Sequence, residues 1–98
     1  MTSLHILAAK NFEFNKKIAE LFLHAGADPN VKDFYGRTPL IVAAGSGNTD
    51  LVELFLKRCP NIDINAQTIG GETAAMKAIV YAKEDCLSLI LQVPSLNK

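Results

Sequence analysis

The residues best suited to metal binding or nucleophilic chemistry are a few histidines and cysteines, and they are scattered along the chain. Cys59 and Cys86, taken with His24, show no zinc-type spacing. His24 stands near the end of an expected helix, where its side chain would interact favourably with the helix dipole. Two cysteines also make no disulfide framework. We therefore expect no bound metal and an intracellular location, cytoplasmic or nuclear.

Two further patterns could suggest catalysis or phosphate binding. The aspartates Asp28, Asp33 and Asp63 are candidates for an acid and base pair. The segment AAGSGNTD, residues 43–50, is rich in glycine, but a phosphate-binding P-loop needs GxxxxGK[ST], and no lysine follows Gly47. No serine lies in a GxSxG nucleophile elbow. The glycines fit a turn between two helices better, so no cofactor is expected.

The composition of the 98-residue chain bears on its partners. Ten basic and ten acidic side chains cancel, and no block of like charge is longer than the pair Lys16 and Lys17. Nothing therefore predicts binding to nucleic acid or to anionic lipid. No apolar run approaches the roughly 20 residues that span a bilayer, and the N-terminus does not resemble a secretory signal. We expect one domain and no membrane insertion.

A repeated sequence pattern indicates the secondary-structure elements that must position these residues. TSLHILA, TPLIVAA and TAAMKAI begin at Thr2, Thr38 and Thr73, and each is followed by a second apolar block, IAELFL, LVELFL or CLSLIL. The three threonines stand 36 and 35 residues apart. Such self-similarity is typical of a stacked array, in which each unit covers the apolar face of the next.

The middle copy, TPLIVAAGSGNTDLVELFL, and the loop GADPN at residues 26–30 closely resemble the ankyrin repeat. The resemblance covers nearly the whole chain. It implies an all-α solenoid of three helix-turn-helix units with short β-hairpin or turn fingers, in one domain with repeats at about 1–35, 36–70 and 71–98. The family period is about 33 residues, so the surplus residues are expected in connections, where loop closure costs little.

The middle copy also indicates where its helices begin and end. Thr38 is expected to cap the first helix, and Gly47 to end it in the left-handed conformation. Ala82 occupies the place of Gly47 in the third copy and suits that conformation less well. Residues 48–50 offer possible caps for the second helix, and the last of them lies at capping-box spacing from Glu53.

The resemblance implies structural roles for several residues that could otherwise do chemistry. His5 stands at the histidine of the family's TPLH motif, where the ring would tie adjacent repeats together; the other copies have Ile41 and Met76 there. The carboxylates of Asp28 and Asp63 would serve the backbone of their loops. We therefore expect a protein that is not an enzyme.

What the resemblance implies instead is binding to another protein, whose identity the sequence does not indicate. In ankyrin proteins the partner usually contacts the finger tips and the inner helices. Those positions carry aromatic, aliphatic and charged residues here: Phe34, Tyr35, Arg37, Ile69 and Glu72 in the fingers, and Lys10, Ser46 and Tyr81 on the inner helices. Aromatic residues and arginine dominate interface hot spots. The alternative is that Phe34 or Tyr35 folds back over its loop, or that these are scattered apolar surface residues without a function.

The two ends of the array leave a second function open. Terminal repeats usually carry polar outer faces. Here the first copy contains Phe12, Phe14, Ile18 and Phe22, and the third contains Val80, Leu87, Leu89, Ile90 and Leu91. The alternative function is therefore a structural segment of a larger scaffold, or a homo-oligomer or longer array joined through uncapped end repeats. These apolar residues could instead fill the insertion loop and the core between repeats.

Overall fold

The computed structural model describes residues 15–59 and 61–92, and these residues form five helices. No strand occurs within these two ranges, and none of their helices combines the length and hydrophobicity needed to cross a membrane. The all-α prediction is confirmed, and the two fingers are turns. The helices are α2 (Asn15–His24), α3 (Pro39–Ser46), α4 (Thr49–Arg58), α5 (Ala74–Val80) and α6 (Glu84–Leu91).

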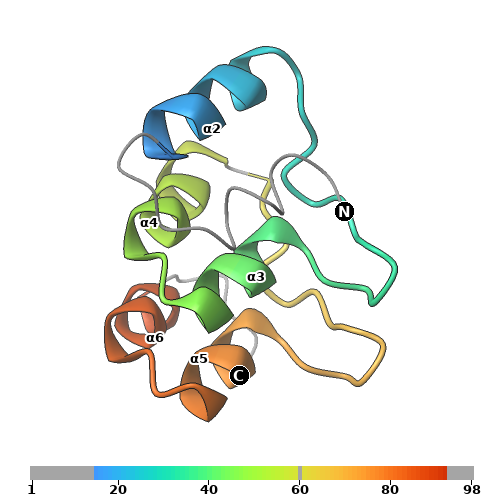
Figure 1. Ribbon diagram of the computed structural model, residues 1–98, viewed down its shortest axis with the longest axis vertical. Coiled ribbons are helices and arrows are strands. Elements are labelled where there is room, and N and C mark those ends of the chain that lie inside the picture. The colour runs from blue at the N-terminus through green and yellow to red at the C-terminus, as the bar shows by residue number, and fades with distance from the viewer. Residues whose placement is uncertain (1–14, 60, 93–98) are drawn as a thin grey trace.

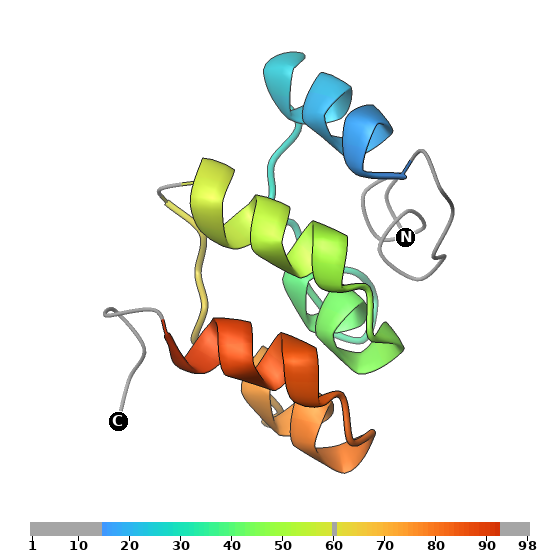
Figure 2. The ribbon, with the colours of Figure 1, turned by 90° about the vertical axis from the view of Figure 1, so that its left-hand side faces the viewer.

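The helices form two layers. Helices α3 and α5 lie side by side next to the two projecting loops (Figure 1), while α2, α4 and α6 stack in front of them in the second view (Figure 2). Each helix contacts its counterpart in the next copy: α2 with α4, α3 with α5, and α4 with α6. The copies therefore stack directly on one another, as the repeated sequence predicts.

The core lies between the layers and is densest in the middle copy. Leu51, Val52 and Phe55 of α4 are fully buried, and so are Ala43 and Ala44 of α3. The two alanines, lacking long side chains, let α3 approach its neighbours closely. Burial of a large apolar side chain stabilises the fold by about 1.5–3 kcal/mol. The middle copy therefore contributes most of the apolar packing among the described residues.

The inner helices α3 and α5 begin with the same cap. The Thr38 hydroxyl accepts a hydrogen bond from the Ile41 amide at 3.2 Å, and the Thr73 hydroxyl accepts one from the Met76 amide at 3.3 Å. Both threonines have an extended backbone. Each hydroxyl satisfies one amide that a helix start leaves without an internal partner. The predicted threonine cap is confirmed.

The inner helices also end alike, in a left-handed residue. Gly47 ends α3 with φ +74°, and Ala82 follows α5 with φ +57°. The amides of Asn48 and Lys83 then donate to the carbonyls of Ala43 and Ala78, at 2.9 and 2.8 Å. These bonds satisfy helix carbonyls that would otherwise lack partners. Alanine adopts this conformation at a cost of about 1–2 kcal/mol that glycine avoids.

The capping box that the sequence suggested for α4 is not formed. The cap is Asn48, whose side-chain oxygen accepts from the Leu51 amide at 3.4 Å. Asp50 lies inside the first turn, because Asn48 offers the same acceptor chemistry two residues earlier. Glu53 accepts instead from the Lys57 ammonium at 3.3 Å. Helix α6 begins after Lys83, which gives no side-chain cap.

Candidate functional site

The two fingers, residues 33–37 and 68–72, are built on one pattern. The Asp33 amide donates to the Arg37 carbonyl, and the Thr68 amide donates to the Glu72 carbonyl, both at 2.9 Å. A side-chain oxygen of the first residue then accepts from the amide of the last, at 2.9 Å in the first finger and 3.2 Å in the second. The turn is therefore closed by its first and last residues, and the side chains at its tip are not needed to hold it.

One backbone hydrogen bond joins the fingers to each other. The Ile69 amide donates to the Tyr35 carbonyl at 3.0 Å. Gly36 lies so close to this junction that a Cβ added there would stand 2.9 Å from the Ile69 nitrogen, and its φ of +77° favours glycine as well. The positive φ and the short distance to the Ile69 nitrogen both disfavour a side chain at position 36. Glycine therefore allows the two fingers to lie in contact.

The loop aspartates serve the backbone, as the resemblance implied. Asp28 accepts from the Asn30 amide at 2.9 Å, and Asp63 accepts from the Asn65 amide at 3.2 Å. The Asn30 side chain then links the two loops, because it donates to the Asn61 carbonyl at 2.9 Å and accepts from the Asp63 amide at 2.7 Å. These carboxylates therefore stabilise the loops in which they lie.

Asp33, the third aspartate considered for chemistry, holds the first finger together. Its side chain is 3% exposed and accepts from the amides of Tyr35 and Arg37 and from Arg37 Nε, the last at 2.7 Å. Burial by itself would raise the pKa of Asp33, but the hydrogen bonds from Arg37 and Tyr35 outweigh burial and hold the pKa below its usual value. Asp33 is therefore ionised at neutral pH and has a structural role.

The side chains at the finger tips extend into solvent. Phe34 is 87% exposed and Ile69 is 78% exposed. The rings of Phe34 and Tyr35 meet edge to face, with centroids 5.5 Å apart, and the Arg37 guanidinium carbon lies 5.3 Å from the centroid of the Tyr35 ring. The alternative in which Phe34 or Tyr35 folds back over the loop is wrong. These side chains form an exposed cluster whose members contact one another.

Between the fingers and α5 lies an open groove of about 470 Å³, which we call the finger groove. Lys77 of α5 lines it, with its Nζ atom 3.0 Å from the Glu72 carboxylate and 5.8 Å from the centroid of the Tyr81 ring. The Tyr81 ring packs over Gly45, where an added Cβ would lie 3.6 Å from it. The groove is lined by Tyr35, Arg37, Thr68, Ile69, Gly70, Glu72 and Lys77.

The structure brings together most of the residues that the sequence proposed for partner binding. Tyr35, Arg37, Ile69 and Glu72 share the finger groove, Phe34 adjoins it, and Tyr81 is joined to it through Lys77. Ser46 is exposed at the end of α3. Lys10 and His5 lie outside the described residues. Sequence reasoning missed Lys77, although its position one helical turn before Tyr81 places both on one face of α5.

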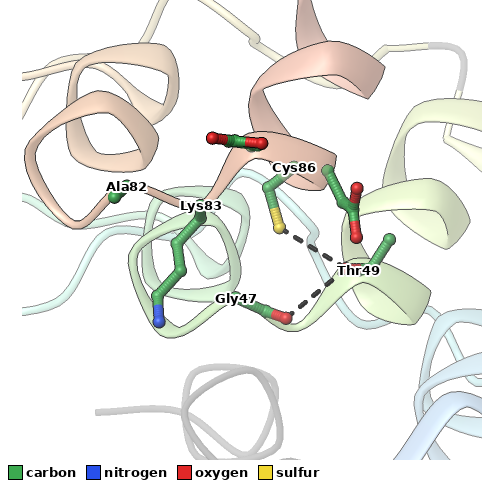
Figure 3. Close-up of a pocket in the computed structure, with 7 residues that line it drawn as sticks. Gly47, Thr49, Ala82, Lys83 and Cys86 are labelled. Atoms are coloured by element: carbon green, nitrogen blue, oxygen red, sulfur yellow. Dashed lines mark hydrogen bonds between the residues drawn. The ribbon is translucent and has the colours of Figure 1, made fainter.

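A second open cavity, of about 300 Å³, lies where the starts of α4 and α6 meet (Figure 3). The Thr49 hydroxyl lies 3.9 Å from the Cys86 sulfur and donates to the Gly47 carbonyl at 3.5 Å. Burial raises the pKa of the Cys86 thiol and that of Cys59. Neither thiol is activated as a nucleophile at neutral pH. Within the described residues, no group of three or more metal-binding side chains occurs.

Comparison with protein families and curated proteins finds repeat proteins along nearly the whole chain. A family model described as "Ankyrin repeats (3 copies)" matches residues 4–98. The mouse SMC5-SMC6 complex localization factor protein 1 is 45% identical over 69 residues, which cover 70% of this chain and 6% of that protein. Human Rabankyrin-5 is 36% identical over 84 residues, which cover 83% of this chain and 7% of that protein. The chain thus spans a small fraction of the length of these relatives.

A solved structure shares the fold over almost the entire chain. It is a chain from the complex of a predatory endopeptidase of Bdellovibrio bacteriovorus with an immunity protein, and it matches with a TM-score of 0.83 at 25% sequence identity. The match covers 98% of this chain and 48% of that chain. The stacked helix pairs described above therefore recur in a protein determined as part of a complex.

Proposed function

Because the chain belongs to the ankyrin repeat family, we propose that it is a non-catalytic module that presents its fingers and inner helices to a protein partner. Ankyrin repeats are generally protein–protein interaction modules, and their stacking creates extended binding surfaces. The observation that carries the proposal is the exposure of Phe34, Tyr35 and Ile69 on fingers whose backbone is held by other residues. The location that suits this role is the cytoplasm or nucleus.

The chemistry of the finger tips supports binding to a protein. Tyrosine and arginine are enriched among the residues that dominate interface energies, and Tyr35 and Arg37 lie side by side here. Nearly the whole Phe34 side chain is available for burial against a partner. Hydrogen bonds within and between the fingers already fix the backbone. Little conformational entropy would therefore be lost on binding.

The test compares partner capture by the wild-type chain and by a variant with Phe34→Ala and Tyr35→Ala, using an extract of the native source. We expect the double variant to bind the captured protein at least about 30-fold more weakly, corresponding to about 2 kcal/mol, with an unchanged thermal unfolding temperature. The matched control is Leu21→Ala, which removes an exposed apolar side chain from the outer helix α2 and should leave binding intact.

Three outcomes would count against this proposal. If the double variant binds as well as the wild type, the finger tips are not the contact surface. If the double variant both loses its partner and unfolds, Phe34 and Tyr35 have a structural role. A loss of binding in the Leu21→Ala control would move the contact surface to the outer layer.

A second candidate, a structural segment that assembles through its end, is favoured by one observation. Met76 is 46% exposed and Ile79 is 61% exposed, whereas Ile41 and Ala44, at the same positions of the middle copy, are 2% and 0% exposed. The third copy thus has uncovered apolar side chains on α5. Of the apolar residues that the sequence placed at this end, Ile90 is buried and Leu87 and Leu89 pack against the core, whereas Val80 and Leu91 are exposed. Sedimentation should then show an oligomer that Ile79→Ser dissociates. A monomer at high protein concentration would remove this candidate.

A further inference from the structure

The first finger is covered on one side by the second, and the contact between them is made by backbone. The Ile69 amide donates to the Tyr35 carbonyl at 3.0 Å. A Cβ added at Gly36 would lie 2.9 Å from the Ile69 nitrogen and 3.3 Å from the Thr68 Cα atom. The backbone of residues 68–69 therefore fills the space beside Gly36 and pairs with the carbonyl that precedes it.

The second finger has the same features, but no described residue fills the corresponding space. Gly71 stands in the place of Gly36 and has nearly the same φ, +81° against +77°. Apart from its chain neighbours, no described atom lies within 4 Å of a Cβ added at Gly71. The Gly70 carbonyl corresponds to that of Tyr35, and no described residue donates a hydrogen bond to it. The outer edge of the second finger thus repeats a backbone-binding position and leaves it open.

An exposed apolar face of α5 lies at the same end of the stack as this edge. Gly45 of α3 faces α5, because a Cβ added there would lie 3.6 Å from the Tyr81 ring and 3.7 Å from the Lys77 Cβ atom. Ile41 lies one turn before Gly45 on the same face, Ala44 adjoins it, and both are buried. Because the copies stack by repetition, the same face of α5 points away from α3, toward the end that the second finger also forms (Figure 1). Its side chains are all exposed, and they are Met76, Ile79 and Val80.

Two of these side chains are too large for a further helix pair to stack in the same way. Ala44 and Gly45 let α5 approach α3, and a Cβ alone at position 45 would already be in van der Waals contact with α5. The equivalent residues of α5 are Ile79 and Val80, whose branched side chains extend beyond Cβ. An inner helix at the same separation would overlap them, and such overpacking is destabilising. The open finger edge therefore fits a thinner partner than another repeat.

We propose that the open edge of the second finger and the exposed face of α5 together bind an extended, uncharged, apolar segment of a protein partner. One amide of the segment donates to the Gly70 carbonyl, as the Ile69 amide does to that of Tyr35, and its side chains pack on Met76 and Val80. Addition of an extended peptide to a free backbone edge is a recurrent mode of recognition. A charged segment would lose water here without gaining an ionic partner, because no charge stands at the five positions of this end surface, Gly70, Gly71, Met76, Ile79 and Val80.

The experiment selects binders from a phage-displayed library of random short peptides on the immobilised wild-type chain. Peptides that also bind the variant with Met76→Ser and Val80→Ser are removed, so that the retained peptides need the end surface. We expect them to be rich in Val, Ile, Leu and Phe and poor in proline and in charged residues. The affinity of the best retained peptide, measured by fluorescence anisotropy, should change little with salt concentration, because no ionic contact is involved.

Two changes then test the backbone hydrogen bond. Methylation of the peptide nitrogens, one at a time, should reveal one position at which binding weakens about tenfold, the scale of one hydrogen bond. Gly71→Ala should weaken binding by a similar factor, because its Cβ would meet the incoming backbone as a Cβ at Gly36 would meet Ile69. The matched control is Gly26→Ala, which should leave the affinity unchanged. Gly26 also has a positive φ, +95°, and open space around it, but it lies in another loop.

Several results would overturn the inference. These are a selection that retains no peptide or mainly charged peptides, a methylation scan without a sensitive position, or an equal effect of Gly26→Ala. The methylation scan uses the wild-type chain, so it decides the question even if Gly71→Ala unfolds the protein. A chain that sediments as an oligomer and is dissociated by Ile79→Ser would show that the end surface binds a second copy instead. The proposed function would survive each of these results if Phe34→Ala with Tyr35→Ala still abolished capture of a protein partner.

Discussion

The inner helices of the middle and third copies begin and end with equivalent hydrogen bonds, but the two copies differ in how far they are buried. Thr38 and Thr73 cap their helices in the same way, and Gly47 and Ala82 end them in the same conformation. Ile41 and Ala44 of the middle copy are buried, whereas Met76 and Ile79 at the same positions of the third copy are exposed. Local sequence therefore sets the backbone of a repeat, and its neighbours set its burial.

The two fingers, which lie at the surface, can be compared in the same way, residue by residue. Asp33 and Thr68 use different side chains to accept the same hydrogen bond from the last amide of the finger. The last residue of each finger carries a side chain of opposite charge, because Arg37 in the first finger corresponds to Glu72 in the second. Positions that hold the turn thus keep their function, while those that face solvent vary. The exposed finger positions are the ones that we propose contact a partner.

The largest expected effect compares equivalent apolar residues in the two copies. Ile41→Ala should cost about 2–5 kcal/mol of unfolding free energy, because it leaves a cavity in the buried middle copy. Met76→Ala should cost about 1 kcal/mol or less, because much of that side chain is already in water. Denaturant unfolding of both variants measures the difference. Equal losses would show that the third copy is covered in solution.

The next effect compares the two finger glycines that have a positive φ, Gly36 and Gly71. Gly71→Ala should cost about 1–2 kcal/mol, because φ is +81° and nothing lies within 4 Å of the added Cβ. Gly36→Ala should cost more, because its Cβ would also meet the Ile69 nitrogen. Thermal unfolding gives the ranking, and faster hydrogen exchange of the Ile69 amide should accompany Gly36→Ala. The reverse ranking would argue against the contact between the fingers.

A smaller, stabilising change tests the helix ends. Ala82→Gly should raise the unfolding free energy by about 1 kcal/mol, because glycine adopts the left-handed conformation without the cost that alanine incurs. For a domain of this size the unfolding temperature should rise by about 4–8 °C. Differential scanning calorimetry measures the shift. An unchanged or lower unfolding temperature would mean that the left-handed turn does not strain Ala82.

The smallest effect concerns pH. The folded-state pKa of Asp33 lies below its unfolded value, so its stabilising contribution is complete above the unfolded pKa of about 4. That contribution is lost as the pH falls through the folded pKa. The difference in unfolding temperature between the wild type and Asp33→Asn should therefore shrink at acid pH. A difference that stays constant from neutral to acid pH would exclude this role for the ionised carboxylate.

The sequence predicted local features better than contacts between copies. Thr38 and Gly47 act on backbone groups a few residues away, so their roles follow from residue type and spacing. The roles of the loop aspartates were implied by the resemblance to the ankyrin repeat. The cap of α4 is Asn48, one of the three residues that the sequence offered, but Asn48 and Asp50 carry similar acceptors, and spacing alone does not choose between them. The finger groove depends on Lys77 reaching Glu72 and on the stacking of two fingers. Such contacts are set by packing, which a repeat pattern does not specify in detail.

Amide hydrogen exchange of the chain with and without its captured partner tests the central claim most directly. Residues 34–37, 69–72 and 77–81 should gain protection in the complex, because the partner is expected to cover the fingers and the end of α5. The outer helices α4 and α6 should exchange at the same rates in both states. Protection gained on the outer helices, with unchanged exchange at the fingers, would contradict the account.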